Sequence, residues 1–130
     1  MSVSPPAAGT AADPYASALG VTVLQAAEEA VRVELTIAGR HLNDRGIAHG
    51  GVLFSLADVA LSVAANLDGR FALVPTATVH FLRPVREGDV LVATASAHHQ
   101  GGTLGLYSVE IRGGGTTVAR MLAQSFTLDR

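Results

Sequence analysis

The chain contains no cysteine and no lysine among its 130 residues, and only 15% of them are charged. Without cysteine there is neither a disulfide framework nor thiolate chemistry. The formal net charge is −2, and all nine basic residues are arginines. Because phosphate neutralisation needs a positive surface, this balance argues against a nucleic-acid-binding protein, although single arginines remain able to contact one anionic ligand.

The sequence also lacks an apolar run long enough to cross a membrane. Its most apolar run, residues 52–67, is shorter than the roughly 20 residues of a spanning helix and has Asp58 near its centre. Residues 1–12 lack the basic and apolar regions of a signal peptide. We therefore predict a flexible tail over 1–12, one domain over 13–130, and a cytoplasmic protein without membrane contacts.

Local patterns predict two helices and a strand in the first half of the chain. DPYASALG, residues 13–20, has the N-cap, proline and final glycine of a short helix. Alternating apolar and polar residues predict a strand over 31–37, preceded by a less regular one. The apolar segment from about 50 to 67 predicts a helix roughly 27 Å long.

After this helix the chain reads as strands only. The connections REG, QGG and GGG are short, which is typical of antiparallel neighbours, so consecutive strands are predicted to pair. The four predicted strands span residues 71–85, 89–99, 103–112 and 116–128. A single sheet must bury one face, so we expect an α+β fold in which the apolar helix lies on one long antiparallel sheet.

Asp58 is the unusual residue of the predicted helix. With Ser55 and Ser62 it forms a narrow polar stripe at spacings of three and four. A buried acid is costly unless a partner satisfies it, and no arginine lies within one turn. A hydrogen bond from either serine or from a backbone amide is the structural alternative. Because the helix gains nothing from this residue, we interpret Asp58 as catalytic.

The helix opens with Gly50 and Gly51. The first N–H groups of a helix lack internal partners and carry partial positive charge. Glycine allows a substrate carbonyl to approach these groups, which then stabilise a developing oxyanion. Both glycines are therefore predicted to contact substrate, with a plain flexible helix start as the alternative.

The five histidines raise the question of a metal site. His98 and His99 are adjacent on a predicted strand and so point to opposite faces. His41 and His49 lie in one loop, but no second pair of ligands completes a set with them. The serines of the polar stripe do not sit on a nucleophile elbow. We therefore expect no metal and no cofactor.

Three motifs resemble those of hotdog-fold acyl-CoA thioesterases, in particular the phenylacetate-degradation (PaaI-like) group. They are HLNDRGIAHGGVLFSLAD (41–58), FLRPVREGD (81–89) and HHQGGTLGLYSVEI (98–111), and the likeness extends over about residues 20–128. The resemblance implies a hotdog fold, in which a long antiparallel sheet wraps around one central helix. It also implies hydrolysis of an aryl- or medium-chain acyl-CoA, such as phenylacetyl-CoA, to a free acid and coenzyme A.

The resemblance assigns roles residue by residue. Asp58 matches the acid that attacks the thioester carbonyl or activates a water, and Gly50 matches the glycine of the oxyanion hole. His49 and Asn43 match residues that hold the thioester end, although Asn43 also suits a turn. Thr76 matches a serine or threonine that hydrogen-bonds the carboxylate or the water.

These roles require two chains. Gly50 and Asp58 are eight residues apart, about 12 Å along one helix. The reacting carbonyl must lie about 3 Å from each of them. Antiparallel helices from two chains meet both conditions, which predicts a homodimer with the site at its interface. The resemblance further implies that such dimers often pair into homotetramers.

Other residues are assigned to substrate binding with alternatives left open. Phe54, Leu61 and the facing Leu53 suit either an acyl pocket or the core. Arg83 and Arg86 suit the phosphates of coenzyme A, or else a solvated turn in which they pair with nearby acids.

Two rival functions stand beside hydrolysis. A hotdog dehydratase needs a histidine and an acid placed to move protons on the acyl chain, which the HGG-x6-D spacing does not suggest. An acyl-CoA-binding or regulatory module without turnover has no need of a buried acid, so Asp58 distinguishes it from an enzyme.

Overall fold

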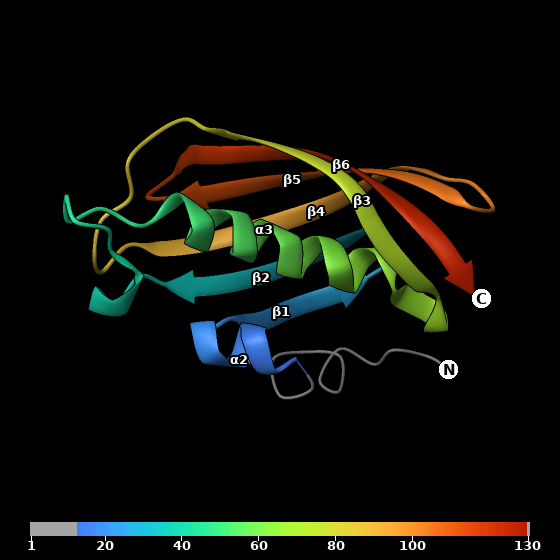
Figure 1. Cartoon of the computed structure of the whole chain (residues 1–130), viewed down its shortest axis with the longest axis horizontal. Coiled ribbons are helices and arrows are strands. Elements are labelled where there is room, and N and C mark those ends of the chain that lie inside the picture. Colours follow the sequence, from blue (N-terminus) through green and yellow to red (C-terminus); the bar gives the residue numbers. More distant parts are fainter. Residues whose placement is uncertain (1–12, 130) are drawn as a thin grey trace.

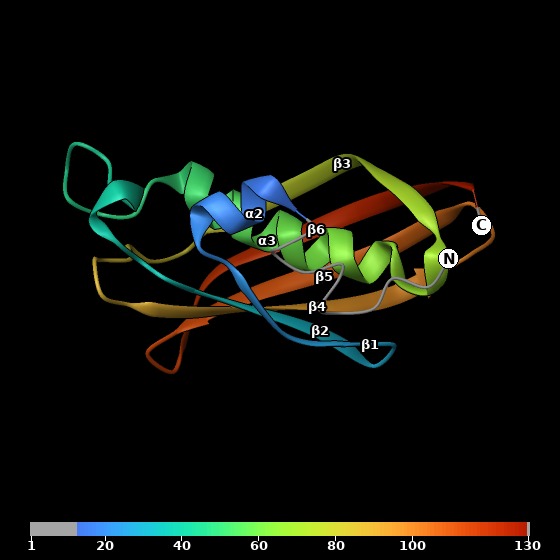
Figure 2. The same ribbon diagram turned by 90° about the horizontal axis from the view of Figure 1, so that it is seen from below.

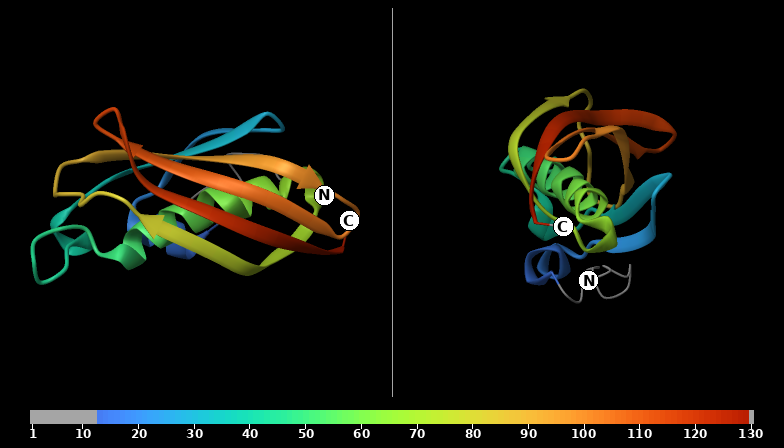
Figure 3. Two further views of the ribbon diagram at one scale, coloured as in Figure 1. Left: turned by 90° about the horizontal axis from the view of Figure 1, so that it is seen from above. Right: turned by 90° about the vertical axis from the view of Figure 1, so that its right-hand side faces the viewer.

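A computed structural model describes residues 13–129, so the predicted tail at 1–12 lies outside the described residues. Its elements are α2 (Pro14–Leu19), β1 (Thr22–Ala27), β2 (Ala30–Thr36), η1 (Gly39–His41), α3 (Gly50–Ala65), η2 (Leu67–Gly69), β3 (Phe71–Phe81), β4 (Val90–Gln100), β5 (Leu104–Gly113) and β6 (Thr116–Asp129). One antiparallel sheet, ordered β1-β2-β4-β5-β6-β3, curves around α3 (Figure 1; Figure 3). The predicted α+β hotdog architecture is confirmed.

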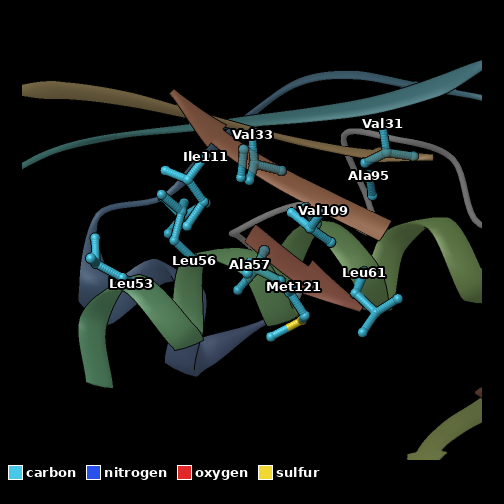
Figure 4. Close-up of a cluster of buried hydrophobic side chains, with 14 of the residues drawn as sticks. Val31, Val33, Leu53, Leu56, Ala57, Leu61, Ala95, Val109, Ile111 and Met121 are labelled. Atoms are coloured by element: carbon cyan, nitrogen blue, oxygen red, sulfur yellow. The ribbon is translucent and has the colours of Figure 1, made fainter. Parts of the chain in front are cut away.

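The core lies between α3 and the inner face of the sheet. Leu56 and Leu61 are fully buried there, and Figure 4 shows them among side chains of β5 and β6 such as Val109, Ile111 and Met121. Burying this apolar face fixes the rotation of the helix. The stripe of Ser55, Asp58 and Ser62 consequently stays only half-buried. Between residues 13 and 129 no helix has both the length and the apolar character needed to cross a membrane.

The end of α3 comes slightly earlier than the sequence predicts. The last helical residue is Ala65, and Asn66 closes the helix. The Asn66 Nδ2 group donates to the Ser62 carbonyl at 2.8 Å, while its Oδ1 accepts the Ala72 N–H, also at 2.8 Å. Asn66 thus ends the helix and starts β3 with one side chain.

The predicted strand over 71–85 is too long, and its predicted pairing is wrong. β3 ends at Phe81 and pairs with β6, whereas β4 lies between β2 and β5. Pro84 has no N–H to give to a sheet ladder, and the buried Val85 accepts the Ala48 N–H at 2.7 Å. Residues 82–89 therefore form a connection from the edge of the sheet to its middle (Figure 1).

The predicted short helix and the strand after it are confirmed. Asp13 caps α2 by accepting the Ala16 N–H at 3.0 Å, and Gly20 ends the helix with a φ of 94°. The residues of β2 alternate as expected, with Val31, Val33 and Leu35 buried. The less regular segment before it is β1, the other strand of a hairpin. Helix α2 contacts α3, and in Figure 2 it lies in front of that helix.

Candidate active site

A cavity of about 370 Å³ opens at the N-terminal end of α3. Four residues that the sequence singled out line it together: Asn43, Gly50, Leu53 and Arg83. The other lining residues are Ile47, Ala48, Phe81, Leu82, Pro84 and Val85. The loop before α3 and the connection after β3 meet here, joined by the hydrogen bond from the Ala48 N–H to the Val85 carbonyl.

Asn43 holds the loop in shape. Its Oδ1 accepts the N–H groups of Arg45, at 2.9 Å, and Ile47, at 3.3 Å. Its own backbone N–H donates to the Ile47 carbonyl at 2.8 Å. This geometry is the turn role that the sequence left as an alternative. Because Asn43 also lines the cavity, the same residue fixes part of the cavity wall.

The two glycines at the start of α3 differ in what their N–H groups do. The Gly51 N–H donates to Nδ1 of His49 at 3.3 Å, which places the proton of the neutral ring on Nε2. Within the described part of the chain, the Gly50 N–H has no such acceptor. Gly50 therefore presents an unoccupied backbone donor at the cavity, whereas Gly51 does not line it.

Phe81 is a site residue that the sequence reasoning missed. A Cβ added to Gly50 would lie 3.4 Å from Cζ of Phe81, so the ring packs directly over this glycine. The motif FLRPV contained the signal, but it was interpreted as strand throughout. The end of β3 at Phe81 is what turns the ring and the residues after it toward the helix start.

Asp58 is half-buried on the outward stripe of α3. Burial, followed by the negative charge of Asp13, raises the pKa of its carboxyl above the ordinary value. Between residues 13 and 129 no group donates a hydrogen bond or forms a salt bridge to this carboxylate. The alternative role, an acid satisfied by Ser55 or Ser62, is thus not observed. An unpaired carboxylate of raised pKa is suited to accept a proton or to attack a carbonyl.

Helix α2 borders this acid, which the sequence did not indicate. The Tyr15 hydroxyl and Oγ of Ser55 are 2.8 Å apart, and Ser55 precedes Asp58 by one helical turn. Asp13 is close enough to act on the Asp58 pKa while it caps α2. The short helix was expected from its caps, but its contact with α3 depends on tertiary packing.

Thr76 is not brought to Asp58 within one chain. It pairs with Gln124 of β6, whose neighbours Ala123 and Ser125 are buried and so point inward. Because side chains alternate along a strand, Gln124 and Thr76 point away from α3. The expected role of Thr76 stays a prediction.

The remaining assigned residues lie in different surroundings. Leu61 is fully buried in the core, and Phe54 is partly buried against it. Arg83 and Arg86 are both exposed, and among the described residues neither forms a salt bridge. The Asp89 carboxylate accepts the backbone N–H of Arg86 at 2.9 Å instead.

His41 is a packing residue. It is buried, its Nδ1 accepts the Ala38 N–H, and its Nε2 donates to the Leu19 carbonyl, both at 2.9 Å. Across residues 13–129, no three His, Cys, Asp or Glu side chains gather in a way that could hold a metal ion.

Comparison with known proteins agrees with this geometry. A family model of the thioesterase superfamily matches residues 45–119. A putative esterase of Deinococcus radiodurans is 45% identical over 100 residues, covering 77% of this chain and 68% of that protein. The acyl-coenzyme A thioesterase PaaI of Escherichia coli is 42% identical over 99 residues, covering 76% of this chain and 71% of that protein.

Solved structures of similar proteins also point to thioesterases. The PaaI protein from the Escherichia coli phenylacetic acid degradation operon superposes with a TM-score of 0.87 at 39% identity, covering 89% of this chain and 85% of that one. A mutant of the phenylacetic acid degradation protein PaaI from Thermus thermophilus superposes with a TM-score of 0.86 at 33% identity, covering 89% and 100%. This chain therefore belongs to the thioesterase superfamily, among its hotdog-fold enzymes.

Proposed function

We propose that the protein hydrolyses an aryl- or medium-chain acyl-CoA, of the phenylacetyl-CoA kind, to a free acid and coenzyme A. The observation that carries the proposal is that α3 bears a hydrogen-bond acceptor and a hydrogen-bond donor that both lack partners among the described residues. One is the carboxylate of Asp58, which has no partner between residues 13 and 129, and the other is the free N–H of Gly50. The PaaI relative is named an acyl-coenzyme A thioesterase, which supports this substrate class.

The proposed reaction places the thioester carbonyl between these groups. Asp58 removes a proton from water, the resulting hydroxide adds to the carbonyl carbon, and the Gly50 N–H donates to the oxyanion. Collapse of this intermediate breaks the C–S bond, and the coenzyme A thiolate takes up a proton. In the alternative course Asp58 attacks the carbonyl itself, and water then hydrolyses the mixed anhydride.

Single-turnover hydrolysis in ¹⁸O-labelled water distinguishes the two courses. With enzyme in excess over substrate, a water activated by Asp58 puts the label only into the released acid. If an anhydride forms, water attack on its Asp58 carbonyl puts the label into Asp58 and releases an unlabelled acid, and mass spectrometry of the Asp58 peptide would detect this.

The proposed site needs two chains, because Asp58 and Gly50 of one α3 are about 12 Å apart along the helix. Strand β3 is suited to join them, since among residues 13–129 it pairs with β6 on one side and its other edge is unpaired. Phe71, Leu73 and Phe81 of this strand are exposed. We propose that β3 pairs with its copy, which sets two antiparallel α3 helices side by side.

The outer face of the sheet supports the further proposal of a homotetramer. Large apolar side chains there are 42% to 63% exposed, namely Leu73, Leu104, Leu106, Leu122 and Phe126. Three of them form a row across the sheet, because Phe126 pairs with both Leu104 and Leu73. An apolar surface of this kind is suited to burial against a second dimer.

Coenzyme A is proposed to approach over the cavity at the start of α3. Arg83 lines this cavity and has no salt-bridge partner among residues 13–129, so its guanidinium is available to a phosphate. Arg86 lies three residues further along the same connection and is exposed. We propose Arg83 as the main phosphate contact and Arg86 as a secondary one.

Thiol release from a panel of acyl-CoAs tests the function, with Asp58→Asn as the decisive variant. We expect turnover to fall by at least about 100-fold in Asp58→Asn, since the variant keeps the shape of the side chain and removes the base or nucleophile. Glu29→Gln, the same chemical change in the exposed β1–β2 turn, is the matched control. Near-normal turnover in Asp58→Asn refutes the assignment, and acyl-CoA binding without any thiol release favours a non-catalytic module.

A further inference from the structure

Helix α2 is an exposed element that the proposed reaction does not yet use. Its Tyr15 hydroxyl lies 2.8 Å from Oγ of Ser55, which belongs to the same polar stripe as Asp58. Helix α2 is fixed at two points independently of this contact. Asp13 caps its start, and the fully buried Ala16 ties it to the core.

Tyr15 is 61% exposed although its hydroxyl is bonded. An aromatic side chain that is held at one end and bare over most of its surface offers a flat apolar wall. This wall stands beside the polar stripe, about one helical turn from the carboxylate of Asp58. An acyl group whose carbonyl lies at Asp58 extends within reach of it.

We propose that α2 forms one wall of the acyl site and that Tyr15 is the residue that favours aryl over alkyl acyl groups. The inference rests on the proposed function, because it places the thioester carbonyl at Asp58.

The expected selectivity follows from the size of an aromatic contact. Ring pairs in offset or edge-to-face geometry gain enough beyond their buried area to change a rate or affinity by about two- to tenfold. An alkyl chain gains the burial but not the ring contact. Phenylacetyl and octanoyl groups have equal carbon number, so their ratio isolates the ring.

The test compares kcat/KM for phenylacetyl-CoA and octanoyl-CoA in Tyr15→Leu, Tyr15→Phe and Ser17→Ala. Ser17 is an exposed residue of the same helix and serves as the control. We expect the aryl-to-alkyl ratio to fall about two- to tenfold in Tyr15→Leu. It should stay within about twofold of wild type in Tyr15→Phe, which retains the ring, and in Ser17→Ala.

Two results overturn the inference. One is an equal loss on both substrates in Tyr15→Leu together with a lower melting temperature, which means that Tyr15 only supports the fold. The other is a Tyr15→Phe variant that behaves like Tyr15→Leu, which means that the ring is not the contact.

Binding measurements separate this inference from the proposed function. Thioether analogues of coenzyme A that carry phenylethyl or octyl groups bind without being hydrolysed, and calorimetry gives their affinity ratio. If wild type hydrolyses no acyl-CoA but the aryl-to-alkyl affinity ratio still falls in Tyr15→Leu, the proposed function is refuted and the role of Tyr15 in acyl selectivity is supported. If wild type hydrolyses acyl-CoA but Tyr15→Leu changes neither the kcat/KM ratio nor the affinity ratio, only the role of Tyr15 in acyl selectivity is refuted.

Discussion

Substituting Gly50 tests the oxyanion role most directly, because its neighbour Gly51 provides a matched control. A Cβ at Gly50 would meet Cζ of Phe81 at 3.4 Å, and a Cβ at Gly51 would meet Nδ1 of His49 at 3.5 Å. Both distances are ordinary contacts, and neither glycine has a positive φ. The fold should therefore accept alanine at either position.

The expected effect on stability is small. Replacing glycine by alanine gains at most about 1 kcal/mol of helix propensity, and less than that in the first turn. Such a change moves the melting temperature of a domain of this size by only a few degrees, roughly 2–8 °C per kcal/mol. A larger effect on activity thus cannot come from loss of folding.

The expected effect on catalysis differs between the two positions. The Gly51 N–H is already bonded to His49, whereas the Gly50 N–H is free at the cavity. In Gly50→Val the two methyl groups reach past the Cβ position toward Phe81 and displace the carbonyl from the donor. Loss of one oxyanion donor lowers kcat by about 100- to 1,000-fold. We expect this loss in Gly50→Val, an intermediate loss in Gly50→Ala, and a change below about threefold in Gly51→Ala.

The assay is continuous detection of released coenzyme A with a thiol-reactive chromophore, and the cysteine-free chain adds no background signal. Melting temperatures of the three variants are measured in parallel. Normal turnover in Gly50→Val refutes the oxyanion role. So does a loss in Gly51→Ala as large as that in Gly50→Ala, because it would mean that any side chain at the helix start disturbs the site.

Three further outcomes are expected. Activity needs the ionised Asp58, so the acid limb of the pH profile should lie above the ordinary aspartate pKa. Asp13→Asn keeps the helix cap but removes one cause of the raised Asp58 pKa, so this variant should move the acid limb to lower pH. An acid limb that stays in place in Asp13→Asn contradicts this coupling. Light scattering at assay concentration should give a dimer or tetramer, and an active monomer would refute the interfacial site. Activity should be indifferent to EDTA, and a loss that a divalent metal restores would overturn the metal-free reading of His41 and His49.

The helix that carries the site could be predicted because its signals are local. Caps, apolar continuity and the three- and four-residue spacing of the polar stripe act within a few residues, so a helix that begins at Gly50 and the stripe that carries Asp58 follow from sequence alone, whereas the end at Ala65 comes earlier than predicted. The hairpins of β4, β5 and β6 follow from short connections in the same way. Even the proposal of a two-chain site rests only on the rise of a helix and the length of a hydrogen bond.

The cavity and the edge position of β3 were decided by contacts between distant residues. β3 pairs with β6 because the edge of β6 is the one that remains unpaired after the sheet has curved around α3. The alternation of apolar and polar residues in a strand carries no information about its partner. The same holds for the ring of Phe81 over Gly50 and for Tyr15 beside Ser55. The sequence thus determined which groups the chain offers, whereas tertiary packing decided which of them meet, because a local pattern fixes the face of an element but not its neighbour.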